Sequence, residues 1–272
     1  MRWDRSHESS DIEDRRSQGG AGGFGGGGGG FPLGLLALAG RFGWRGILLA
    51  LLVIGAMTYG PRMCATGPEP AERAQVVERG GGQDELARFV GFVLDDVQDM
   101  WARELNGYKR AHLVLFRDSV ASACGTASAA VGPFYCPLDQ RVYIDLSFYD
   151  QLRRRFGAAG DFAQAYVIAH ELGHHVQNLR GVLGRGEVDS IAVELQADCL
   201  AGAWGRDAQR RDLLEAGDLD EALTAAAAVG DDTIQRKTQG RIQPETWTHG
   251  SAAQRRAAYE RGFDGGPRAC GI

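Results

Sequence analysis

The chain has 272 residues, 44% of them hydrophobic and 24% charged, and a formal net charge of -5. This composition is typical of a globular protein and lacks the excess of lysine and arginine that marks a nucleic-acid-binding protein. The five cysteines form no CxxC pair, which argues against a zinc ribbon or a thioredoxin-type motif.

Residues 1–41 start as a polar stretch and continue into a glycine-rich tract, GGAGGFGGGGGG. Such a segment buries too little apolar surface to offset its chain entropy, so we predict a disordered tail. An apolar run over residues 42–60 follows, FGWRGILLALLVIGAMTYG. It is close to the roughly 17–20 residues that a membrane-spanning helix needs, and Trp44 and Tyr59 fall where interfacial aromatic residues occur.

The charges on either side of this run predict its orientation. Arginines are more frequent before the run than after it (Arg2, Arg5, Arg15, Arg16, Arg41 and Arg45 against Arg62 and Arg73). The positive-inside rule then predicts a single-pass protein of the cytoplasmic membrane, with the N-terminus inside. Residues 61–82 would be a linker and residues 83–272 a domain outside. A buried helix of a soluble protein remains the alternative.

Residues 83–272 carry helical and strand patterns in turn. Residues 83–106 have the three-four hydrophobic spacing of an amphipathic helix, and AHLVLFRD (111–118) is typical of a strand. RVYIDLSFYDQLRRRF (141–156) starts as an alternating strand and continues as a helix. Asp161 is a candidate N-cap and Gly181 a candidate stop for the next helix. Three more helices are predicted, at 187–209, 219–229 and 251–261. The pattern indicates an α+β domain.

The helix after Asp161 contains the sequence HELGHH. His170 and His174 are four residues apart and therefore lie on one helix face, where both imidazoles can bind one Zn2+. Glu171 is rotated by about 100° from His170 around the axis, so it is offset from the metal and can face a bound water. This H-E-x-x-H pattern predicts two ligands and a general base.

A third ligand is predicted in SIAVELQADCLAG, on the following helix. Glu194 and Asp198 are four residues apart and share a face. Glu194 as ligand would leave one position open for water, as catalytic zinc requires. Asp198 would hold the distal nitrogen of a ligand histidine. A solvated face is the alternative, but the apolar neighbours favour burial, and a buried carboxylate needs a partner.

Other residues have less specific predictions. His249, in THGSAAQRR, is a candidate donor to the developing oxyanion or else a surface-loop histidine, and Arg255 or Arg256 would position its segment. His175 has the wrong helical phase to join the ligands. Cys124 and Cys136 bracket a Gly- and Pro-containing loop, and they form either a disulfide, which fits an oxidising compartment, or two buried free thiols.

Taken together, HELGHHVQ, VELQADCLAG and THGSAAQRR resemble the gluzincin plan of His-Glu-x-x-His followed by Glu-x-x-x-Asp. The match is closest to the neutral zinc metallopeptidases of bacteria, which are single-span membrane proteins, and it extends over nearly the whole chain. The resemblance implies a zincin-like fold with a small sheet above the helix of His170. It also implies that substrate adds as a strand beside an edge strand, for which QRVYIDLSF (140–148) is the candidate.

The predicted function is a membrane-anchored zinc peptidase that acts on a peptide or protein substrate and binds no nucleic acid. Zn2+ would be held by His170, His174 and Glu194, with Glu171 as base. Two alternatives remain open: a zinc-stabilised binding or scaffold domain that does not cleave, and a metal hydrolase of non-peptide amides or esters.

Overall fold

The computed structural model describes residues 1–18, 70–183 and 190–272. Residues 1–20 and 80–272 group into one compact unit. The predicted membrane span at 42–60 lies outside the described residues. Among the described helices, none is both long and apolar enough to cross a bilayer.

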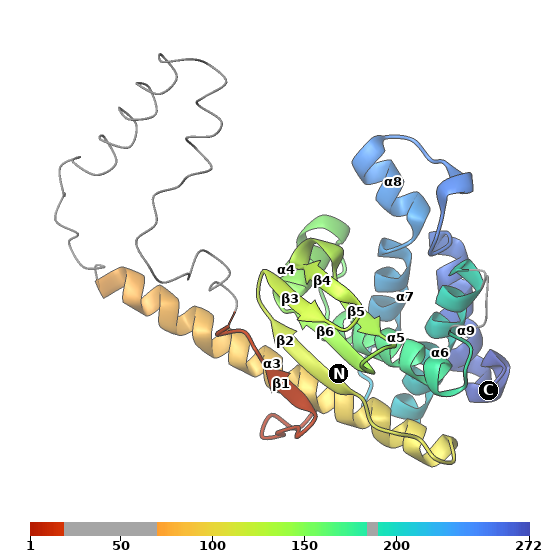
Figure 1. Ribbon diagram of the computed structural model, residues 1–272, viewed down its shortest axis with the longest axis horizontal. Coiled ribbons are helices and arrows are strands. Elements are labelled where there is room, and N and C mark those ends of the chain that lie inside the picture. Colours follow the sequence, from red (N-terminus) through yellow and green to blue (C-terminus); the bar gives the residue numbers. More distant parts are fainter. Residues whose placement is uncertain (19–69, 184–189) are drawn as a thin grey trace, which may run out of the picture. The chain divides into compact units, whose positions relative to one another are not determined.

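A four-stranded sheet has the order β1-β2-β6-β5 (Figure 1). Its strands are β1 (Ile12–Asp14), β2 (His112–Phe116), β5 (Phe134–Cys136) and β6 (Arg141–Asp145). The first three strands in this order run parallel, and β5 runs antiparallel to β6. Leu113 and Leu115 enter the main core, whereas Val114 and Phe116 enter a smaller cluster on the other face. Both faces of β2 are therefore buried, as its continuous apolar sequence requires.

The small cluster is covered by a hairpin, β3 (Ser119–Ser122) and β4 (Gly125–Ser128), since Val120 belongs to it. Helices that contribute to the main core are α3 (Pro70–Glu104), α4 (Ser147–Phe156), α5 (Asp161–Leu179), α6 (Ser190–Arg210), α7 (Asp218–Ala228) and α9 (Ala252–Gly265). A further helix, α8 (Asp231–Gln239), contributes no residue to this core. Short 3-10 helices are η2 (Ala129–Val131), η3 (Pro244–Thr246) and η4 (Pro267–Cys270). The predicted mixed α+β class is confirmed.

The helix ends differ slightly from those predicted. The N-cap of α5 is Gly160, so Asp161 is the first helical residue and the prediction of Asp161 as N-cap is wrong. Gly181 has φ +66°, the left-handed conformation that follows many helix ends. The predicted linker at 61–82 is also wrong in part, because α3 already begins at Pro70.

Two close helix contacts set the position of α5 and α6. A Cβ on Gly173 of α5 would lie 3.0 Å from the carbonyl oxygen of Ala197 on α6. A Cβ on Gly202 of α6 would lie within 2.0 Å of the carbonyl oxygen of Tyr259 on α9. Glycine at both positions lets the backbones approach closely, so α6 packs tightly against α5 and α9, and α5 in turn packs against β5 and β6 (Figure 1).

The N-terminal residues belong to the folded unit, and the prediction of disorder for residues 1–41 is wrong for 1–18. Ile12 of β1 pairs with Leu113 of β2. Trp3 packs edge-on against Phe89 of α3 at a centroid distance of 5.4 Å. The Met1 ammonium lies 2.6 Å from a carboxylate oxygen of Asp161. The few apolar residues of this polar stretch pack against α3 and β2. They follow no helical or strand periodicity, so the sequence pattern did not predict their burial.

The pairing of β1 with β2 limits how the chain can be arranged across a membrane. β1 and β2 lie on either side of residues 42–60 in the sequence but are hydrogen-bonded neighbours in the sheet. A single membrane crossing between them would place the two strands in different compartments. The predicted arrangement, with the N-terminus inside and residues 83–272 outside, is therefore incompatible with the sheet.

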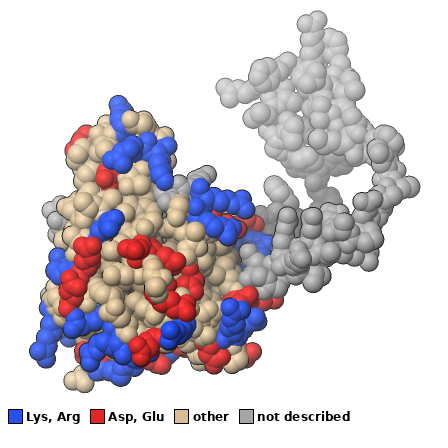
Figure 2. All heavy atoms as spheres, turned by 180° about the vertical axis from the view of Figure 1, so that it is seen from behind, with Lys and Arg blue, Asp and Glu red and all other residues tan. Residues whose placement is uncertain are grey.

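The surface carries charges of both signs. Figure 2 shows basic and acidic side chains interspersed over the face seen from behind. Many of these charges pair with each other. Arg110, for example, donates to Asp11, Asp95 and Asp99 at 2.6, 2.6 and 2.7 Å, and thereby ties the N-terminal segment to α3.

Candidate metal centre and cleft

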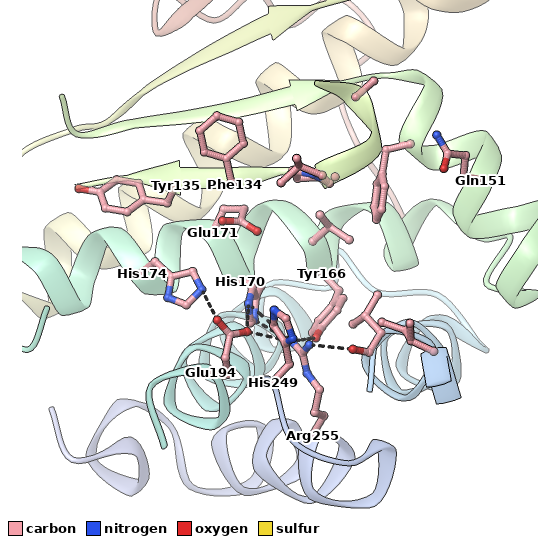
Figure 3. A pocket seen from close by; sticks show the side chains of 18 of the residues that line it. Phe134, Tyr135, Gln151, Tyr166, His170, Glu171, His174, Glu194, His249 and Arg255 are labelled. Atoms are coloured by element: carbon pink, nitrogen blue, oxygen red, sulfur yellow. Dashed lines mark hydrogen bonds and ion pairs between the residues drawn. The ribbon is translucent and has the colours of Figure 1, made fainter. Parts of the chain in front are cut away.

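The structure brings the three proposed ligands together from two helices. Nε2 of His170 lies 3.3 Å from Oε2 of Glu194, and Nε2 of His174 lies 3.4 Å from Oε1 of the same carboxylate. All three donor atoms lie within 4.8 Å of one another. Figure 3 shows the two imidazoles and the carboxylate converging on one side of α5.

These distances fit a zinc ion. Zinc binds imidazole nitrogen and carboxylate oxygen at about 2.0–2.2 Å in a tetrahedral arrangement, which separates neighbouring ligand atoms by about 3.3 Å. Two histidines and a glutamate form the donor set of one class of catalytic zinc sites, in which the fourth position stays open. The residues present therefore suit this metal.

His170 is held from behind by a buried carboxylate. Its Nδ1 lies 2.9 Å from Oδ1 of Asp198, which leaves Nε2 facing Glu194. Tyr166 also donates to Asp198, and Arg255 donates to it through Nε at 2.8 Å. Asp198 is completely buried, and the arrangement is the carboxylate–histidine–metal pattern that fixes a ligand's tautomer and orientation.

The electrostatics of this cluster suit a bound cation. Burial acts against charge on His170, but Asp198 and Glu194 outweigh it and raise the pKa of His170 to about 10. Burial likewise acts to raise the pKa of Glu194, yet hydrogen bonds from His170 and His174 hold it well below its usual range. Without metal, a proton on His170 supplies the positive charge that the two carboxylates require.

His174 has a different partner. Its Nδ1 lies 2.8 Å from Oε1 of Gln177, one helical turn further along α5. Gln177 is completely buried and donates its amide to the carbonyl oxygen of Val193 on α6. Both ligand histidines are thus oriented through Nδ1, one by a carboxylate and the other by a neutral amide.

Glu171 lies on a different side of α5 from the ligand group. Its carboxylate points towards β5, beside Phe134 and Tyr135 (Figure 3). It lines the same cleft as the three ligands. Burial raises the pKa of Glu171 above its ordinary value, although His174 and His170 act to lower it. A buried carboxylate with a raised pKa is suited to accept and return a proton.

The cleft has a volume of about 540 Å³ and lies between α5 and β5. On the side of α5 that precedes His170, its walls are largely apolar and include Val131, Phe148, Val167, Val229 and Ile234. In the described residues β5 pairs only with β6, so β5 is the sheet edge that borders the cleft. The predicted edge strand at 140–148 is wrong, because β6 is paired on both sides.

His249 lines the cleft and is half-exposed. Asp231, at the start of α8, accepts hydrogen bonds from the backbone N–H groups of Thr248, His249 and Gly250 at 2.8, 2.6 and 3.0 Å. Its other oxygen lies 3.2 Å from Nδ1 of His249. Burial acts to raise the pKa of Asp231, but these hydrogen bonds lower it. Asp231 thus fixes the loop, and it shares Nδ1 of His249 with the Thr248 hydroxyl, which lies 2.9 Å away.

The other residues singled out in the sequence lie outside the proposed metal-ligand group. His175 is buried outside the metal group, with Nε2 2.6 Å from the carbonyl oxygen of Lys109 and Nδ1 3.0 Å from the Tyr135 hydroxyl. Arg256 is exposed, whereas Arg255 is buried against Asp198.

The described residues contain two disulfides. Cys124 and Cys136 are joined, with an S–S distance of 2.02 Å, and the bond links the turn before β4 to the end of β5. A second disulfide joins Cys199 of α6 to Cys270 near the C-terminus. Cys64 lies outside the described residues.

Gln177, Tyr166 and Asp231 also support the site but were not predicted from the sequence. Gln177 and Tyr166 are each within one helical turn of a ligand histidine, so their phase on α5 is a usable signal. Asp231 lies 18 residues before His249, and no local pattern connects the two.

Two histidines on one helix and a glutamate on the next thus form a candidate zinc-binding group in a mixed α+β fold. The family model described as "Putative neutral zinc metallopeptidase" matches residues 1–271. The chain belongs to this family.

Relatives extend this likeness along the chain. This chain is 40% identical to the uncharacterized protein YpfJ of Escherichia coli K12 over 289 aligned residues. The alignment covers 99% of this chain and 98% of that protein. The chain is 47% identical to the uncharacterized protein Rv2575 of Mycobacterium tuberculosis H37Rv over 195 residues. This alignment covers 65% of the chain and 67% of that protein. No solved structure matches the chain.

Proposed function

We propose that this protein is a zinc-dependent peptidase that hydrolyses peptide bonds with Glu171 as general base. One observation supports this above all others. His170, His174 and Glu194 meet at zinc-binding distances, while Glu171 stands apart from them in the same cleft. A purely structural zinc site is closed by four protein ligands and has no use for a separate buried carboxylate beside a cleft.

When zinc is bound to these residues, it supplies a Lewis acid that polarises the scissile carbonyl and lowers the pKa of water. Glu171 takes the proton of the attacking water and returns it to the leaving amine. Its raised pKa suits both transfers. His249, whose backbone N–H is held by Asp231, donates a hydrogen bond from its imidazole to the oxygen on which negative charge develops.

The proposed substrate is an extended peptide that lies along β5. An unpaired strand edge offers backbone donors and acceptors at regular spacing, and a peptide can add to it as a further strand. The apolar walls on the Val167 side of the cleft favour an apolar side chain next to the scissile bond.

We also propose that the domain acts outside the cytoplasmic membrane and that residues 42–60 attach it there. Two disulfides in one small domain support an oxidising compartment. Because β1 belongs to the sheet, residues 1–18 must lie on the same side as residues 80–272.

The test uses the full-length protein and its Glu171→Gln variant. The wild-type protein should hold about one zinc per chain and cleave an unfolded protein substrate. Glu171→Gln should keep the zinc and lose cleavage, because it removes a base but no ligand. Glu260→Gln, which changes an exposed glutamate, serves as the matched control and should cleave normally.

Other outcomes separate the alternatives. Full activity of Glu171→Gln in cleavage would contradict the assigned base. Zinc binding without cleavage of any protein or peptide would favour a scaffold domain. Hydrolysis of simple esters or amides alone would favour a non-peptide hydrolase. Comparison of new protein N-termini in cells with wild-type or Glu171→Gln protein would identify the substrates.

A further inference from the structure

Gln177 connects the helix of the two histidines to the helix of the glutamate. It lies on α5, completely buried, and its amide nitrogen is 2.7 Å from the carbonyl oxygen of Val193 and 3.0 Å from Oε1 of Gln196, both on α6. Val193 directly precedes the proposed ligand Glu194. One side chain therefore fixes the distance between the two ligand-bearing helices on the His174 side.

The partners of Gln177 determine which way its amide points. A backbone carbonyl can only accept, so the NH2 group of Gln177 must face Val193. Its oxygen then faces Nδ1 of His174 at 2.8 Å. That contact is a hydrogen bond only if Nδ1 of His174 carries the proton. The lone pair on Nε2 is thereby left for the metal, on the side of Glu194.

The hydrogen bonds continue to the C-terminus. The amide nitrogen of Gln196 donates to the carbonyl oxygen of Cys270 at 2.9 Å, so its oxygen is turned towards Gln177. Cys270 is joined to Cys199 of α6 by a disulfide. A continuous chain of contacts therefore runs from His174 through Gln177 and Gln196 to a covalently fixed C-terminal segment.

We propose that Gln177 is a positioning residue for His174 and that Gln196 and the Cys199–Cys270 disulfide hold it in place. The disulfide thus contributes to zinc affinity although it touches no ligand. This inference rests on the part of the proposed function that makes His174 a ligand, and it does not depend on peptide cleavage.

The principal test measures zinc affinity by competition with a chromophoric chelator, without any peptide. Loss of a hydrogen-bond partner behind a ligand histidine lowers metal affinity by about 10–100-fold. We expect this loss for Gln177→Leu and a smaller loss for Gln196→Leu. Gln164→Leu is the matched control: Gln164 also lies on α5, its oxygen is buried without a hydrogen-bond partner in the described structure, and its replacement should leave zinc affinity unchanged.

The two disulfides provide a second comparison. The double variant Cys199→Ser/Cys270→Ser should bind zinc more weakly than wild type. Cys124→Ser/Cys136→Ser should bind it as wild type does, because no described hydrogen bond links that disulfide to His174. Equal effects of the two double variants would mean that the disulfides act only on general stability, and would overturn the role given to Cys270.

A measurement on the wild-type protein keeps the inference testable if Gln177→Leu does not fold. Nitrogen-15 NMR of the zinc-loaded wild-type protein should show the proton of His174 on Nδ1, which faces Gln177. A proton on Nε2 would overturn the inference, as would wild-type zinc affinity of Gln177→Leu. Failure of the proposed function is distinct: the wild-type protein would bind zinc normally and cleave no peptide.

Discussion

The guanidinium of Arg255 donates to both carboxylate oxygens of Asp198, at 2.8 Å from Nε and 2.9 Å from one terminal nitrogen, and both side chains are buried. Burial acts to raise the pKa of Asp198, but Arg255 and His170 lower it to about 2. The charge that orients His170 therefore depends on an arginine from α9, a helix that contains none of the proposed ligands.

Replacing Arg255 should strongly lower the free energy of unfolding. Arg255→Met leaves Asp198 as a buried charge without its strongest partner, and loss of one member of such a pair costs about 3–5 kcal/mol. We expect this decrease in the free energy of unfolding, measured with urea and a chelator present. Arg256→Met, at the adjacent exposed position, should change stability by less than about 0.5 kcal/mol. Similar losses in the two variants would contradict the buried ion pair.

The metal-free protein should lose stability as the pH rises above neutrality. The pKa of His170 is raised from 6.5 to about 10 in the folded protein. A raised pKa stabilises the fold fully below the unfolded value, and this stabilisation is lost as the pH rises from about 6.5 towards 10. Urea unfolding at several pH values in this window measures it.

His170→Gln should remove most of this pH dependence. His112→Gln changes an exposed histidine on β2 and should leave the dependence as in the wild type. A pH profile of His170→Gln that matches the wild type would show that another group is responsible.

Asp231 should act on catalysis through His249. Loss of one donor to a developing oxyanion lowers kcat by about 100–1000-fold, so His249→Ala should lower kcat in this range with little change in KM. Asp231→Asn should cause a smaller loss, since the imidazole is no longer fixed by a carboxylate. Steady-state kinetics on a peptide substrate measure both effects.

A double variant separates this role from a general one. If Asp231 acts only by positioning His249, Asp231→Asn should have no further effect on kcat in the His249→Ala background. Additive losses would point to an independent role. Asp220→Asn, at an exposed position of α7, should leave kcat unchanged in either background.

Residues 1–18 and residues 80–272 should lie in the same compartment. Arg5 and Leu138 are both highly exposed, so Arg5→Cys and Leu138→Cys, each in a Cys64→Ser background, can be labelled in intact cells with a membrane-impermeant thiol reagent. On the proposed location outside the cytoplasmic membrane, both sites should react, because residues 1–20 and 80–272 belong to one compact unit. Reaction of Leu138→Cys alone would restore the single-crossing topology.

The central helices could be predicted because their information is local. His170, Glu171 and His174 occur on one helical stretch, and Glu194 and Asp198 on the next, so spacing alone predicts which side chains share a face. The structure places these residues as that spacing requires. The helices predicted at 187–209, 219–229 and 251–261 correspond to α6, α7 and α9, whose ends lie within a few residues of those bounds.

Long-range contacts could not be predicted in this way. β1 is only three residues long, too short to show an alternating pattern, and its burial depends on α3 and β2, about 100 residues away in the case of β2. The cleft edge was assigned to β6 instead of β5 because strand order depends on pairing, and β5 has just three residues. Asp231 and His249 likewise meet only through the packing of α8 against the loop.

The place of β1 in the sheet has a practical consequence for isolating the protein. A protein that starts at residue 61 would keep every proposed ligand and yet leave one side of β2 without its partner strand. Unpaired edges of this kind associate with one another, so such a truncated protein should aggregate. Joining residue 18 to residue 80 through a short flexible linker would keep β1 in place, and would give a compact protein better suited to crystallisation.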